Sequence, residues 1–170
     1  MGRDLNRAVP RLKDFAEKLI LKAKAKLDLD VFVVEVDRPF LTQVAYYAQG
    51  RDPLTEVNAL RKRAGLGPIT ASENRYKITW TLASQHIVNL ANDDITDNLS
   101  RAVDFGIKDK MGKYCGDSKT DVNKDNIPDY IQLGALAKKI DPGIEWGGEW
   151  KKKDLPHYQI RKQNIQYRRI

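Results

Sequence analysis

The sequence predicts one α+β domain spanning residues 1–170, because helical and extended patterns alternate along a chain that shows no linker and no internal repeat. A chain of 170 residues is long enough to bury one sizeable hydrophobic core. Hydrophobic residues make up 41% of the sequence and charged residues 31%, which is typical of a folded domain and not of a disordered chain.

The first part of the chain predicts three helices and one strand. Apolar residues recur at helical spacing over residues 5–27. These residues are Leu12, Phe15, Leu19, Ile20 and Ala23. Residues 30–36 are rich in β-branched side chains and predict a strand that ends before Pro39. Residues 41–50 and 55–64 predict two short helices.

The second part predicts the rest of the sheet and one more helix. The predicted extended segments are residues 76–82, 101–107, 145–150 and 156–160. Residues 109–125 are polar and predict a loop, and residues 127–140 predict an amphipathic helix. The residues of this helix expected in the core are Tyr130, Ile131, Leu133, Leu136 and Ala137.

The net charge of +7 favours an anionic partner, such as a cell-wall polymer or nucleic acid. No helix-turn-helix, zinc-finger or ribonucleoprotein motif is visible, so we expect no nucleic-acid partner. No apolar run is long enough to span a membrane, so stable membrane insertion is not expected. The first residues also lack the apolar segment of a signal peptide, which predicts a protein made in the cytoplasm.

The chemistry centres on the two histidines of the chain, His86 and His157. Asp104 lies inside an apolar, strand-like segment, where a carboxylate is costly to bury unless it is paired or binds a metal. Two imidazoles and one carboxylate are a normal ligand set for catalytic zinc, with a fourth position for water. Asp154, three residues before His157, is the candidate base for the proton of that water.

Four segments resemble the L-alanyl-D-glutamate peptidases, relatives of the D-alanyl-D-alanine carboxypeptidases that include phage endolysins. The first segment has Arg38 five residues before Gln43 and closes with Tyr-Ala-Gln-Gly-Arg. The second approaches His86, the third is the Ala-Val-Asp-Phe around Asp104, and the fourth holds Asp-Leu-Pro-His-Tyr around His157. The four segments lie within residues 30–160, most of the chain.

The resemblance implies a small antiparallel sheet packed against helices, the Hedgehog/DD-peptidase-like fold, with the zinc site on the sheet. His86, Asp104 and His157 would be the zinc ligands, and Asp154 would be the general base. Arg38 would bind a carboxylate of the stem peptide, a role suited to a guanidinium group; a surface salt bridge is the alternative.

Two aspartates compete for the third ligand position. In the family the first histidine and the aspartate are seven residues apart, with alanine two residues before the aspartate, and Asp93 keeps this spacing from His86. Asp104 keeps the sequence context but lies eighteen residues on. We favour Asp104, because a ligand must sit on a rigid element and Asp93 lies in a loop-like polar stretch. The difference then corresponds to a loop insertion of about eleven residues, which costs little.

A second metal site is predicted where oxygen-bearing side chains alternate before the last helix. The side chains are Asp121, Asn123, Asp125 and Asp129. They resemble the start of a calcium loop, although Gln132 stands in place of the glutamate at the twelfth position. The alternative is a polar turn that caps the helix.

Together these observations predict a zinc-dependent peptidoglycan endopeptidase that hydrolyses the L-alanyl-D-glutamate bond of the stem peptide by metal-activated water. A D-alanyl-D-alanine carboxypeptidase and a non-catalytic binder of the wall are the alternatives. We expect a monomer without a separate wall-binding domain, acting as a phage endolysin that leaves the host cytoplasm through a holin and lyses the cell.

Overall fold

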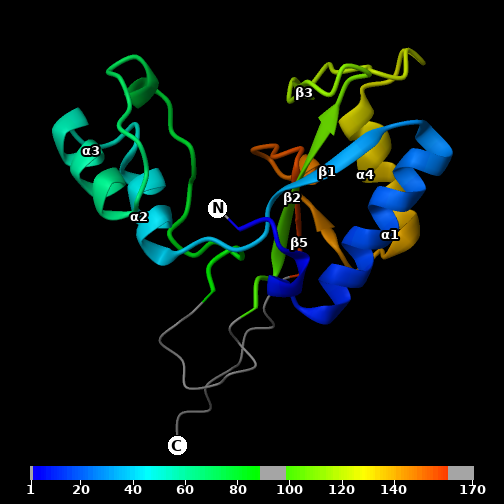
Figure 1. Cartoon of the computed structure of the whole chain (residues 1–170), viewed down its shortest axis with the longest axis horizontal. Coiled ribbons are helices and arrows are strands. Elements are labelled where there is room, and N and C mark those ends of the chain that lie inside the picture. The colour runs from blue at the N-terminus through cyan, green and yellow to red at the C-terminus, as the bar shows by residue number, and fades with distance from the viewer. Residues whose placement is uncertain (1, 89–98, 161–170) are drawn as a thin grey trace, which may run out of the picture.

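The computed structural model describes residues 2–88 and 99–160, and it confirms the predicted α+β fold with an antiparallel sheet. The helices are α1 (Pro10–Leu27), α2 (Phe40–Ala48), α3 (Leu54–Arg63) and α4 (Asp129–Ile140), with short 3-10 turns η1 (Leu5–Arg7), η2 (Glu73–Arg75) and η4 (Gly147–Glu149). The strands are β1 (Asp30–Glu35), β2 (Ala102–Lys108), β3 (Tyr114–Cys115), β4 (Glu145–Trp146) and β5 (His157–Gln159). Figure 1 shows α1 and α4 together on one side of the strands, while α2 and α3 lie apart on the other.

The sheet is ordered β1-β2-β5-β4, and β3 pairs with the outer part of β2. Every pairing between these strands is antiparallel. The register sets Glu35 of β1 opposite Asp104 of β2, and Asp104 opposite His157 of β5. Three polar side chains therefore lie in one row across three strands.

The two faces of β2 and β5 have opposite character, because successive side chains of a strand point to opposite faces. Val103, Phe105 and Ile107 of β2 are fully buried in the core, as is Tyr158 of β5. Full burial of a residue such as Phe105 contributes about 1.5–3 kcal/mol to stability. The core residues of α1 and α4 cover this face, which leaves the opposite face for Asp104 and its neighbours.

The helix predictions were correct to within a few residues, with two differences. The first helix begins only at Pro10, because the preceding residues form η1. In α4, Ile131 is 40% exposed and does not enter the core, because it lies on the outer side of the helix, whereas Tyr130 and Leu133 are fully buried.

The strand predictions were less accurate. Residues 76–82 form no strand and are held by side chains of α2 and the following turn instead of by a neighbouring strand. The predicted loop 109–125 contains β3, because the chain reverses at Gly112, whose φ of 80° favours glycine, and pairs back on β2. The predicted strands at 145–150 and 156–160 shorten to β4 and β5, with η4 following β4.

Within the described part of the chain, no helix is both long enough and apolar enough to cross a membrane. Asp93, the competing candidate for the third zinc ligand, lies outside the described residues, as does the basic tail at 161–169.

Candidate metal centre

The three residues predicted to hold zinc come from separate elements and meet at one point. Asp104 and His157 face each other across β2 and β5. His86 arrives from a segment that is tied to the chain on both sides, since its carbonyl accepts a hydrogen bond from the Arg38 amide at 2.9 Å and the Gln85 carbonyl accepts one from the Arg101 amide at 3.0 Å. The sheet and this anchored segment together fix the three side chains.

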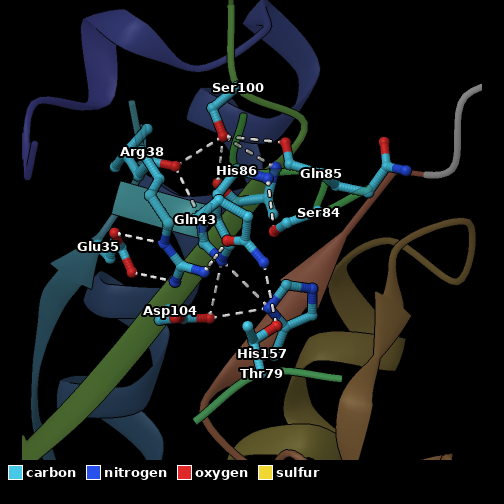
Figure 2. A network of polar contacts seen from close by, with 12 residues as sticks. Glu35, Arg38, Gln43, Thr79, Ser84, Gln85, His86, Ser100, Asp104 and His157 are labelled. Atoms are coloured by element: carbon cyan, nitrogen blue, oxygen red, sulfur yellow. Dashed lines mark hydrogen bonds and ion pairs between the residues drawn. The ribbon is translucent and has the colours of Figure 1, made fainter. Parts of the chain in front are cut away.

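The donor atoms of the three side chains are close enough to share one ion. His86 Nε2 lies 3.2 Å from Asp104 Oδ1, and His157 Nδ1 lies 2.9 Å from the same oxygen. The two nitrogens are 3.2 Å apart. Figure 2 shows the two rings and the carboxylate pointing toward a common centre. Both histidines are buried, with exposed fractions of 1% for His86 and 6% for His157.

The outer nitrogen of each ring fixes which tautomer is present. His86 Nδ1 lies 2.7 Å from the carbonyl oxygen of Val36, which can only accept, so this nitrogen carries the proton. Gln159 donates its amide NH₂ to Glu145 at 2.6 Å, so its oxygen faces His157 Nε2 at 3.0 Å and accepts a proton there. The inner nitrogens, His86 Nε2 and His157 Nδ1, are thus left with free lone pairs.

This arrangement fits a zinc ion. Two nitrogen lone pairs and a carboxylate oxygen within about 3 Å of one another repel unless a cation or a proton lies between them. Ligands of a tetrahedral zinc, each about 2.0–2.1 Å from the metal, are about 3.3 Å apart. Among the described residues, only His86, Asp104 and His157 form a group of three or more His, Cys, Asp or Glu side chains with this convergence.

The charge on Asp104 is stabilised by its neighbours. Burial opposes the ionised carboxylate, but His86 and His157 together hold the pKa of Asp104 well below its usual range. For His157, burial opposes the charged ring, yet Asp104, which can accept a hydrogen bond from Nδ1 of the charged ring, raises the pKa of His157 above its usual value. The carboxylate is therefore ionised at neutral pH, as a metal ligand must be.

A cavity of about 790 Å³ opens over the three ligands, and Asp154, Arg38 and Trp80 are among its lining residues. Asp154 is solvent-exposed as a residue and is one of those that line the cavity. Partial desolvation there, followed by the negative charge of Asp104, raises the pKa of Asp154. A carboxylate with a raised pKa is a stronger base than an ordinary aspartate.

Arg38 lines the cavity, but its charge is already paired. Glu35 accepts from Arg38 Nε at 2.9 Å and also from Nη2, and Gln43 accepts from Nη1 at 2.6 Å. The guanidinium also lies over the ring of Tyr46, 5.2 Å from its centre. Both members of the Arg38–Glu35 pair are buried, with exposed fractions of 9% and 3%.

Three supporting residues were not predicted as part of the site: Glu35, Gln43 and Gln159. Gln43 fixes the cavity wall, because its amide donates to the Thr81 carbonyl at 2.5 Å and to Thr79 Oγ1 at 3.1 Å. Two of them could have been predicted from their spacing to Arg38, because Glu35 lies three residues before it and Gln43 five residues after it. Gln159 gave a weaker signal, two residues after His157 on the same face of β5.

The predicted calcium loop lies directly before α4. Its side chains are arranged differently from the three converging side chains of the cavity. Asp121 accepts from the amides of Asp125 and Asn126, both at 3.1 Å, and Asp129 accepts from the Val122 amide at 2.8 Å. The other carboxylate oxygen of Asp129 is buried without a hydrogen-bond partner. No side chain caps α4, whose N-cap is Pro128, so the alternative of a capping turn is wrong in that detail.

Comparisons with known proteins agree with the fold and with the family resemblance. The peptidoglycan L-alanyl-D-glutamate endopeptidase CwlK of Bacillus subtilis is 27% identical over 152 residues, which cover 89% of this chain and 72% of that protein. The crystal structure of the L-Ala D-Glu endopeptidase ChiX of Serratia marcescens superposes with a TM-score of 0.50 at 22% identity, over 92% of this chain and 83% of that one. No protein-family model matches the chain. The resemblance predicted from the four segments is confirmed by the first comparison, and the predicted fold by the second.

Proposed function

We propose that this chain, which resembles L-alanyl-D-glutamate peptidases over most of its length, is a zinc-dependent peptidoglycan endopeptidase that cuts the L-alanyl-D-glutamate bond of the stem peptide. The observation that carries the proposal is the convergence of His86 Nε2, His157 Nδ1 and Asp104 Oδ1 at the floor of the cavity. Similarity to CwlK and ChiX supports the substrate, because both are named for this bond.

His86, Asp104 and His157 would hold the zinc, with their outer hydrogen bonds keeping both rings in the ligating tautomer. When bound, zinc supplies a Lewis acid for the scissile carbonyl and lowers the pKa of a water molecule toward about 7. The cavity above the ligands leaves room for the peptide, whose backbone must lie across this floor for the reaction.

Asp154 would take the proton from the attacking water and pass it to the leaving amine. Its position is fixed by Gly147, whose carbonyl accepts from the Asp154 amide at 3.0 Å. A Cβ on Gly147 would come within 2.4 Å of the Asp154 carbonyl oxygen, so no larger residue fits there without moving the base. The His157 amide in turn donates to the Asp154 carbonyl at 3.2 Å, which couples the base to a ligand.

The role of phage endolysin, with release through a holin and lysis of the host, is part of the same proposal. The net charge of +7 supports it, because a basic protein is attracted to an anionic wall. Expression in a bacterial host with and without a co-expressed holin tests it. We expect lysis only with the holin, and lysis without any pore would contradict release by this route.

Mass spectrometry of digested stem peptides tests the proposed reaction. The purified protein is expected to release L-alanine and a peptide that begins with D-glutamate, and EDTA is expected to stop the reaction. Release of D-alanine alone would show a carboxypeptidase instead, and binding to the wall without any new peptide would show a non-catalytic binder.

Asp154→Asn separates the base from the metal ligands. The variant is expected to lose about 100- to 10,000-fold in kcat, the usual contribution of general base catalysis. It should keep its zinc, because Asp154 is not one of the converging ligands. Full activity in this variant would remove Asp154 from the proposed mechanism.

A further inference from the structure

Arg38 lines the cavity, but it offers a substrate no unpaired positive charge. The Arg38 guanidinium donates to both oxygens of Glu35, so this buried pair carries no net charge. The remaining acids at the floor, Asp104 and Asp154, are negative. Zinc would offset these charges at the ligands, and a substrate carboxylate that does not bind the metal would be stabilised further by a cation on the cavity wall.

Lys151 and Lys152 are the other cations that line the cavity. Neither forms an ion pair with any acid in the described ranges 2–88 and 99–160. They directly follow Trp150, whose ring lies 5.1 Å from that of His157, so this part of the chain passes close to His157. Their charges are thus free to pair with a ligand of the cavity.

Three cationic side chains lie near the ring of Trp80. Trp80 lines the cavity and is 56% exposed, which is unusual for so large an apolar side chain. The Lys152 ammonium lies 3.4 Å from the ring centre, Lys77 lies 5.4 Å away, and Arg51 lies 5.8 Å away. We call these four residues the Trp80 cluster.

Within the Trp80 cluster, Lys152 is the cation placed to meet a ligand. Arg51 donates to the carbonyls of Tyr47 and Thr79, so its hydrogen-bonding groups are engaged by the protein. Lys77 does not line the cavity. The ring of Trp80 restrains the Lys152 ammonium over the cavity, so less side-chain entropy is lost when it binds an anion.

The proposed substrate carries the matching charge. A glutamate residue has two carboxyl groups, and only one of them continues the peptide, so the other is a free carboxylate a few bonds from the scissile nitrogen. A lysine beside the metal ligands can pair with this carboxylate, whereas converting the carboxylate to an amide removes the charge and the strongest hydrogen-bond acceptor.

We propose that Lys152, held over the ring of Trp80, binds the free carboxylate of the D-glutamate residue and makes the enzyme selective for acidic over amidated stem peptides. This inference rests on the proposed function and adds a specificity residue to the same cavity. It transfers to Lys152 the carboxylate-binding role that the sequence assigned to Arg38.

The test uses two synthetic L-alanyl-D-glutamyl peptides that differ only in the free glutamate carboxyl group, which is a carboxylate in one and a primary amide in the other. The wild-type protein is expected to show about tenfold higher kcat/KM on the carboxylate peptide, the size expected of one charge-assisted hydrogen bond. The difference should lie in KM, because this contact is made equally in the ground state and the transition state.

Four variants assign the effect. Lys152→Met should cut both peptides with the efficiency that the wild type shows on the amide, while Lys152→Arg should keep most of the preference. Lys153→Met removes the same charge from the next residue, which does not line the cavity, and should behave as the wild type. Zinc content confirms that each variant is folded. In Lys151→Met the preference should persist.

Each remaining outcome counts against the proposal. Equal cleavage of both peptides by the wild type overturns this inference alone, as does a preference that survives in Lys152→Met or disappears in Lys151→Met. Cleavage of neither peptide overturns the proposed function and this inference with it.

Discussion

The zinc ligands and the acidic loop (Asp121, Asn123, Asp125 and Asp129) were both predicted as metal sites, yet they are built in opposite ways. His86, Asp104 and His157 are far apart in sequence and come from three separate elements. Their inner atoms have no backbone donor between them and face one point. In the acidic loop the side chains are neighbours in sequence, and their oxygens accept hydrogen bonds from the loop's own amides.

The two clusters differ in whether their candidate ligand atoms are already hydrogen-bonded within the protein. At the two histidines predicted to bind zinc, the protein satisfies the outer nitrogens with Val36 and Gln159 and leaves the inner lone pairs unsatisfied. In the acidic loop, most side-chain oxygens already accept hydrogen bonds. One buried oxygen of Asp129, which has no hydrogen-bond partner, is the exception. Side chains with unsatisfied lone pairs can bind a cation with little reorganisation, whereas side chains already hydrogen-bonded to amides must first break those hydrogen bonds.

The largest effect is expected from removing a ligand of the first site. His157→Ala should abolish zinc binding and lower activity at least about 1,000-fold, because the metal chemistry is lost. Asp125→Asn, a matched change in the acidic loop, should leave both zinc content and activity unchanged. Metal analysis and peptide cleavage on the same preparations check this, and equal damage from the two substitutions would break the comparison.

A smaller effect is expected from the residue that orients His157. Gln159→Met removes the acceptor of the Nε2 proton and should weaken zinc binding about 10- to 100-fold, as for other residues that orient metal ligands. Gln159→Glu keeps an acceptor at this place and should retain more of the affinity. Competition with a chelator of known affinity measures both, and unchanged binding in Gln159→Met would show that the ring is oriented by other contacts.

Calcium binding by the acidic loop stays a prediction and is expected to give a modest effect. A cation would relieve the repulsion between Asp129 and its neighbours Asp121 and Asp125, which together with burial raises the pKa of Asp129. Calorimetric titration of the zinc-loaded protein with calcium should then give heat for one site and raise Tm as calcium saturates it. The absence of heat would leave only the hydrogen-bonded turn.

The smallest effect concerns pH. Because burial raises the pKa of Asp129, the folded state holds this proton more tightly than the unfolded state. The resulting stabilisation is fully present below about pH 3.9 and is lost as pH rises through the raised pKa. Asp129→Asn, measured without calcium, should flatten this dependence. If the stability of Asp129→Asn depended on pH in the same way as that of the wild type, this role of Asp129 would be contradicted.

The sequence was enough to predict the candidate ligands, which the structure brings together, but not the residues that support them. Asp104 could be favoured over Asp93 because a carboxylate inside an apolar strand needs a partner, and the structure sets Asp104 within β2. The register that puts Asp104 opposite His157 could not be predicted, because it depends on how two distant strands pack. The orienting role of Gln159 follows from that register.

The role of Arg38 shows a second limit of the sequence. The resemblance implied that Arg38 binds a substrate carboxylate, which stays a prediction, and only the fold shows that Arg38 also pairs with Glu35 of the same chain. Segment 76–82 shows a third limit, since the sequence predicted an extended segment of the sheet there. Its apolar side chains instead face outward, and Ile78 and Trp80 line the cavity, because no neighbouring strand pairs with the segment.

Zinc content in two aspartate variants tests the central claim most directly. Elemental analysis of purified protein should find about one zinc per chain in the wild type and in Asp93→Ala, and none in Asp104→Ala, because only Asp104 lies with both histidines among the described residues. Zinc retained in Asp104→Ala and lost in Asp93→Ala would contradict the account.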